Sequence, residues 1–219
     1  MTETHITLRD GVLHLGDDPR AVKAVSVTAS GVSEDARYLL HLARHFKDLE
    51  HVIQAAVYLR DTPDAPEIVR EALWRSAIVT LCLCFDPHPK VERRPLKRRK
   101  VFPDPNARAA LEDFVKLRNK DIAHDEGVTV GAELLAVLGR EGDPDKVLEL
   151  KYIQIRSLHS SPQMIDNLGR LAEEATTWIE GEYTRVSELV TEELRAQPYD
   201  ALMALPASSV EVKKHLPQG

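Results

Sequence analysis

The sequence has only two cysteines among its 219 residues, and both lie in one apolar segment. A single residue separates Cys82 from Cys84, a spacing too tight for an ordinary structural disulfide. No second cysteine pair is present to complete a zinc site. We therefore expect both thiols to be reduced in a cytoplasmic protein, and we expect no metal site.

The sequence also lacks long apolar runs and an excess of positive charge. No run reaches the ~20 apolar residues that a membrane span needs, and the N-terminus is too polar for a signal peptide. We therefore expect neither a membrane protein nor a secreted one. The net charge of −6 argues against a protein coated in basic surface, but it allows a local basic patch.

Most of the chain has the residue spacing of amphipathic helices. Ser33 is a suitable cap for the first of them, which is predicted to end near Asp61, before two prolines. The second ends in a run that is apolar on every side, which indicates a helix buried at the centre of the domain. The last is longer than a bundle of this size needs, so part of it is expected to project or to form a dimer interface. The helices are predicted over residues 34–61, 64–85, 106–124, 132–138 and 162–196.

The remaining regular segments have the pattern of β-strands. Two short strands flank Asp10-Gly11, a two-residue hairpin signal, and residues 147–155 are predicted to form a strand that pairs with them. The predicted fold is therefore mainly α: a bundle of four to five helices with a small β element. The predicted divisions are a β element at 1–30, a helical bundle at 31–196 and a partly ordered tail at 197–219.

A basic segment, residues 86–105, separates the second predicted helix from the third. Its prolines prevent a long helix, and its charge is suited to binding phosphates through counterion release. A solvated loop is the simpler interpretation. Phe102 is its only aromatic ring, which does not favour base recognition by stacking. The side chains expected to contact RNA are Lys90, Arg93, Arg94, Lys97, Arg98, Arg99 and Lys100.

The end of the third predicted helix carries the most informative stretch of the chain. On a helical wheel, Arg118 falls near the middle of the apolar face. An unpaired guanidinium is costly against a core. Arg118 therefore either has an internal partner, such as Asp121, or lines a groove that admits an anion.

The sequence R-N-K-D-I-A-H, residues 118–124, resembles the signature of the HEPN superfamily. That signature has an arginine, a polar residue, a short spacer and a histidine. Arg118, Asn119 and His124 match it, with five residues between the arginine and the histidine. The order and length of the helices are most similar to the abortive-infection branch of phage-defence proteins. The resemblance implies a metal-independent endoribonuclease of a phage-defence or toxin–antitoxin system, with RNA, a second copy of the chain and an antitoxin or defence protein as partners.

The matched residues suit RNA cleavage, because RNA carries its own nucleophile in the 2′-hydroxyl group and needs neither a metal nor a cofactor. The His124 imidazole can take or give a proton near neutral pH. Arg118 can hold the scissile phosphate through two parallel hydrogen bonds. Asn119 is suited to orienting the phosphate or the histidine. The charged neighbours expected beside this site, which either tune or neutralise it, are Lys120, Asp121 and Asp125.

The spacing sets a geometric condition on this site. Arg118 and His124 are six residues apart, about 120° around a helix, so they converge only if the helix loosens or the arginine reaches across. One copy supplies one imidazole, whereas a symmetric dimer supplies both a base and an acid.

Two alternatives remain open. One is a HEPN-like module that binds RNA or a nucleotide without cutting, and the other is a dimerising interaction subunit in which Arg118 is structural.

Overall fold

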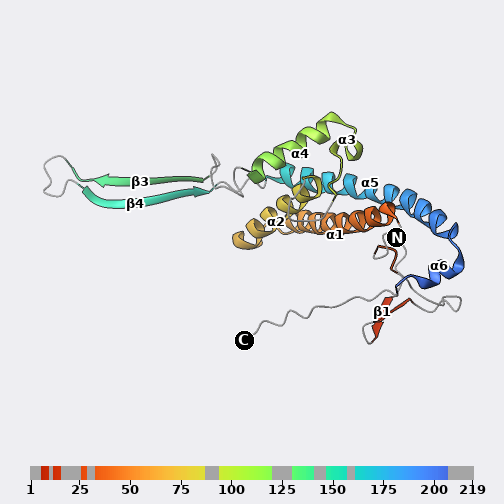
Figure 1. Cartoon of the computed structure of the whole chain (residues 1–219). Coiled ribbons are helices and arrows are strands. Elements are labelled where there is room, and N and C mark those ends of the chain that lie inside the picture. The colour runs from red at the N-terminus through yellow and green to blue at the C-terminus, as the bar shows by residue number, and fades with distance from the viewer. Residues whose placement is uncertain are drawn as a thin grey trace. The chain divides into compact units, whose positions relative to one another are not determined.

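The computed structural model gives a mainly helical protein, with six helices and two antiparallel two-stranded sheets among the residues that it describes (Figure 1). This confirms the predicted mainly α fold. None of the helices in this part of the chain has the length and apolar character needed to cross a lipid bilayer. The described residues are 6–9, 12–15, 26–28, 33–86, 94–119, 130–140, 147–156 and 161–206.

The chain divides into two compact units. Residues 45–178 form one unit, and residues 1–44 with 179–219 form the other. The helices are α1 (Glu34–Asp61), α2 (Glu67–Phe85), α3 (Arg98–Val101), α4 (Pro105–Leu117), α5 (Pro162–Arg195) and α6 (Tyr199–Ala204). The strands are β1 (Ile6–Arg9), β2 (Val12–Leu15), β3 (Val130–Leu138) and β4 (Val147–Arg156).

Polar side chains fix both ends of α1. The Oγ atom of Ser33 accepts hydrogen bonds from two backbone N–H groups of the first turn, at 3.2 and 3.4 Å, which confirms the predicted cap. At the other end, Nη1 of Arg70 donates to the carbonyl oxygens of Leu59 and Thr62, at 2.9 and 2.8 Å. These bonds satisfy carbonyls that a helix end leaves without an intrahelical partner.

The C-terminal half of α2 lies in the core of residues 45–178. Its burial was predicted on every side, but Leu83 is 37% exposed, so the prediction holds for most of the segment only. Trp74 of α2 packs edge to face against Phe114 of α4, with ring centroids 6.0 Å apart. The buried residues around it include Leu49, Val52 and Leu59 of α1, Leu111 and Phe114 of α4, and Leu168, Leu171 and Ala175 of α5.

The second unit has a small apolar core of its own. The hydroxyl of Tyr38 on α1 donates to the Glu182 carboxylate on α5, at 3.4 Å. The C-terminal half of α5 therefore packs on α1, and the dimer interface predicted for this helix stays a prediction. The core consists of buried Ala36, Val186 and Val190, with Val27, Tyr38, Leu39 and Leu194 packed around them.

The β structure differs from the prediction in two respects. Residues 132–138, predicted as a short helix, belong to strand β3, and β4 pairs with β3 rather than with the N-terminal strands. The predicted N-terminal hairpin is present as the separate pair β1–β2. Pairing with a neighbour in sequence closes a short loop, which costs less entropy than pairing with a strand more than a hundred residues away.

Several helices also begin or end at residues other than those predicted. α2 begins at Glu67 rather than at residue 64, because Pro66 keeps the preceding residue out of the helical conformation. α4 ends at Leu117, and Arg118 and Asn119 continue it in a wider π-type turn. The rest of the helix predicted to reach residue 124 lies outside the described residues. The predicted tail contains the short helix α6.

Candidate functional site

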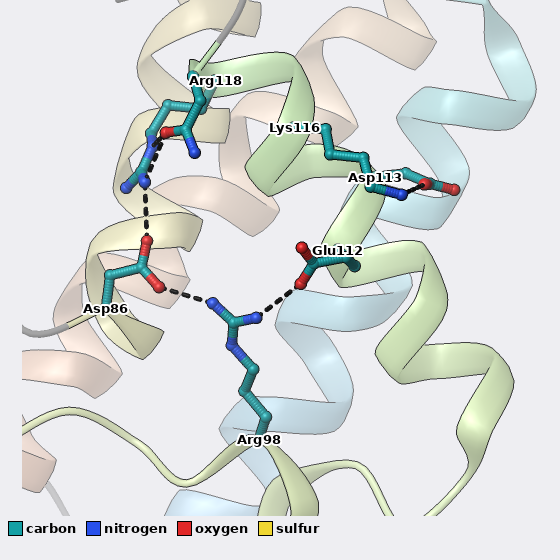
Figure 2. A network of polar contacts seen from close by, with 7 residues as sticks. Asp86, Arg98, Glu112, Asp113, Lys116 and Arg118 are labelled. Atoms are coloured by element: carbon teal, nitrogen blue, oxygen red, sulfur yellow. Dashed lines mark hydrogen bonds and ion pairs between the residues drawn. The ribbon is translucent and has the colours of Figure 1, made fainter.

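The candidate site lies where α4 ends, at Arg118. Its Nη2 atom lies 2.8 Å from Oδ2 of Asp86, the residue that follows α2. Nε and Nη2 also donate to Oδ1 of the adjacent Asn119, at 3.0 and 2.8 Å (Figure 2). Arg118 therefore has an internal partner, as one of the two sequence interpretations required, and that partner is Asp86.

The Asp86 carboxylate lies between two guanidinium groups, as Figure 2 shows. Its second oxygen, Oδ1, accepts a bond of 2.6 Å from Nη2 of Arg98, whose Nη1 lies 2.7 Å from Oε2 of Glu112. Two acids and two arginines thus form a chain of charge-assisted hydrogen bonds, in the order Arg118, Asp86, Arg98, Glu112. We call these four residues the arginine–carboxylate network. Its formal charges cancel.

The backbone on either side of α2 and α3 holds this network in place. Asp86 is extended, and its N–H donates to the carbonyl of Cys82. The N–H of Leu96 donates to the carbonyl of Cys84 at 2.9 Å, and Nε2 of the buried His45 lies 2.9 Å from the carbonyl oxygen of Arg94. The described part of the basic segment is therefore fixed to the core just before Arg98. A basic segment that was expected to be an open loop is partly folded here.

One edge of the Arg118 guanidinium is without a partner in the described part of the chain. Its side chain is 21% exposed, and Nη1 has no hydrogen-bond acceptor among the described residues. The other three bonds fix the plane of the group while leaving the two Nη1 protons for a ligand. An anion such as a phosphate oxygen can accept from this edge without breaking the bond to Asp86.

No known family model, curated protein or solved structure matches this chain.

The predicted catalytic residues are only partly placed. Arg118 and Asn119 contact one another at the end of α4. His124 and its charged neighbours Lys120, Asp121 and Asp125 lie outside the described residues, so their approach to Arg118 stays a prediction. In the described part of the chain, no group of three or more potential ligand side chains is placed to hold a metal ion.

The predicted RNA-binding residues fall into different environments. Arg98 is held by Asp86 and Glu112, so its charge is already partnered. Phe102 is fully buried, 5.3 Å from Phe85 between ring centroids, so it cannot stack on a base. Lys90 and Arg93 lie outside the described residues. The exposed members are Arg94, Lys97, Arg99 and Lys100.

Sequence reasoning missed Asp86 and Glu112. The available signal was an arginine on an apolar face, which requires an acid from another part of the chain. Asp86 is the first acid after the long apolar run, where the buried helix was predicted to end. That position made it a candidate partner, but only the folded structure brings it to Arg118.

Two cysteine thiols lie near the network. Both are free and buried, as predicted for core residues. Burial raises the pKa of the Cys82 thiol to about 12, although the positive charge of Arg118 acts in the opposite direction. Cys82 therefore stays protonated near neutral pH and is neither a nucleophile nor a metal ligand there.

Proposed function

We propose that this protein is a metal-independent endoribonuclease of a phage-defence or toxin–antitoxin system. The observation that supports the proposal is the orientation of Arg118. Asp86 and Asn119 fix its guanidinium, and within the described part of the chain Nη1 donates to no acceptor. A fixed donor pair of this kind is suited to a phosphate whose charge increases in the transition state.

The proposed reaction uses the RNA as its own nucleophile. The 2′-oxygen loses its proton to a base and bonds to the adjacent phosphorus, and the bond from phosphorus to the 5′-oxygen breaks. The leaving 5′-oxygen takes a proton, so the products are a 2′,3′-cyclic phosphate and a 5′-hydroxyl. His124 serves as the base or the acid. The second imidazole comes from another copy of the chain.

The network gives Asp86 a defined part in this scheme. It does not touch the RNA, but it fixes the guanidinium that does, so Asp86 is a positioning residue. Arg98 joins the same carboxylate to α3, where Arg99 and Lys100 are exposed. Cations that continue from the network along the chain are suited to holding phosphates on either side of the cleaved one.

Cleavage of single-stranded RNA in the presence of a chelator tests the proposal. We expect the protein to cut, to leave cyclic phosphate ends, and to lose about 100-fold or more in rate with Arg118→Ala or His124→Ala. Lys116→Ala is the matched control, because Lys116 pairs with the exposed Asp113 and not with the network. Circular dichroism checks that each variant is folded. Equal rates for the wild type and His124→Ala would show that the nuclease proposal is wrong.

The pairing of Arg118 favours a second candidate, an RNA- or nucleotide-binding module that does not cut. Asp86 neutralises part of the positive charge that catalysis would use. This candidate predicts that RNA binds without any cleavage and that Arg118→Ala weakens the binding while His124→Ala does not. Fluorescence anisotropy with a labelled RNA, followed by gel analysis of the same sample, distinguishes the two functions.

A further inference from the structure

The β3–β4 hairpin carries an apolar face that neither the nuclease proposal nor the binding alternative uses. In the register of the hairpin, Leu134 lies opposite Tyr152 and Ala136 lies opposite Leu150. Side chains directly opposite in an antiparallel pair share one face of the sheet. Five large residues that the register places on this face are between 52% and 68% exposed: Leu134, Leu138, Val147, Leu150 and Tyr152.

The opposite face of the hairpin is different in character. It carries Glu133 and Glu149, and Nζ of Lys151 lies 3.2 Å from a carboxylate oxygen of Glu149. The two faces therefore differ in charge: between residues 133 and 152 one is apolar, and the other mixes these charged side chains with Leu135 and Val137. A two-stranded hairpin is at most marginally stable in water unless its apolar face packs on something.

We propose that this apolar face is an interface between two copies of the chain, with the two hairpins packed face to face about a two-fold axis. An apolar face is complementary to itself, as a two-fold interface requires. The net charge of the hairpin also permits two copies to pack together. The two strands carry two acids, Glu133 and Glu149, and two cations, Lys151 and Arg156, so two hairpins do not repel one another although each chain carries −6.

The area of the face is sufficient for such an interface. Five large side chains, each burying on the order of 100 Å², cover about 500 Å² on each copy and about 1,000 Å² in total. That total is at the lower limit of a specific protein–protein interface. Between residues 133 and 152 this face carries no charged side chain, and Arg156 lies opposite Val130 at its far end. The interface does not depend on whether the protein cuts RNA.

Sedimentation of the full chain tests the interface. We expect the wild type to be a dimer at about 50 µM, and the double variant Leu134→Asp with Leu150→Asp to be a monomer. Ile68→Asp is the matched control, because Ile68 of α2 is an exposed apolar residue outside the hairpin and is 72% exposed. This variant is expected to remain a dimer. A monomeric wild type, or a double variant that remains dimeric, overturns the proposal.

Cross-linking identifies the face without relying on a disruptive variant. Leu150→Cys places a thiol on the apolar face, and Lys151→Cys places one on the opposite face of the same strand. With a short bismaleimide, we expect a covalent dimer from Leu150→Cys and several-fold less from Lys151→Cys. The wild type gives the background, because its own two cysteines are buried. Equal yields, or more product from Lys151→Cys, would overturn the face-to-face packing.

Discussion

Asp86 is the residue on which the candidate site depends most, because one carboxylate holds two guanidinium groups. In Asp86→Asn, one oxygen becomes an amide nitrogen that cannot accept from an arginine. We expect a loss of about 1–2 kcal/mol in the free energy of unfolding, since the network is only partly exposed. Urea unfolding measures it.

The control for Asp86→Asn is the same substitution at Asp113, another acid that forms an ion pair with a cation. Asp113 pairs with Lys116, and both side chains are more than 60% exposed. Asp113→Asn should therefore change the free energy of unfolding by less than about 0.5 kcal/mol. If both substitutions shift the unfolding midpoint equally, the network contributes nothing beyond an ordinary surface pair.

The Cys82 thiol predicts a dependence of stability on alkaline pH. Its pKa rises from 9.0 to about 12 in the folded protein, so between these values the unfolded chain binds fewer protons than the folded one. The free energy of unfolding therefore falls as pH rises, by up to about 1.4 kcal/mol per pH unit from this group. Urea unfolding at pH 8 and pH 10 should show a smaller decrease for Cys82→Ala than for the wild type. Parallel decreases would contradict the assignment.

At the scale of elements, the end of α1 depends on a side chain from α2. Arg70→Ala removes the donor to two carbonyl oxygens, and we expect it to cost about 1–2 kcal/mol in the free energy of unfolding. Arg75→Ala, on the same helix, removes a surface pair with Glu71 and should cost less than about 0.5 kcal/mol. Thermal unfolding followed by circular dichroism compares the two. A larger loss for Arg75→Ala would contradict the capping role.

Helices were more predictable than strands in this chain, for a physical reason. Helical hydrogen bonds are local, so the apolar spacing and the Ser33 cap were enough to locate α1. A strand depends on its partner, which a local turn signal identified for β1 and β2 but not for β3 and β4. The Ala- and Leu-rich sequence of β3 has high helix propensity, and only the pairing with β4 overrides it.

The candidate site was predictable to the same limited degree. The apolar wheel showed that Arg118 needed a partner, and distance along the chain favoured Asp121, which lies outside the described residues. Among the described residues the partner is Asp86. Asp86 comes 32 residues earlier and reaches Arg118 only because α2 and α4 pack together. Contacts of this kind depend on tertiary packing, which a single sequence does not encode locally.

At the scale of the whole molecule, a chain of net charge −6 that binds RNA must do so through a local basic surface. Neutralising Lys97, Arg99 and Lys100 together by glutamine should then weaken RNA binding. It should also reduce the slope of log K against log salt concentration by about 2, since each phosphate contact on a single strand contributes about 0.7. Titrations with labelled single-stranded RNA at several salt concentrations measure the slope.

The matched control neutralises three other exposed cations, Lys47, Arg185 and Arg195. Each of them already pairs with an acid on its own helix. Removing them changes the net charge by the same amount, so a purely global charge effect would weaken binding equally in both triple variants. We expect the control to keep the wild-type slope, because the release of counterions depends on contacts with phosphates and not on total charge. If the control lowers the slope as much as the α3 variant does, the exposed cations around α3 are not the RNA-binding surface.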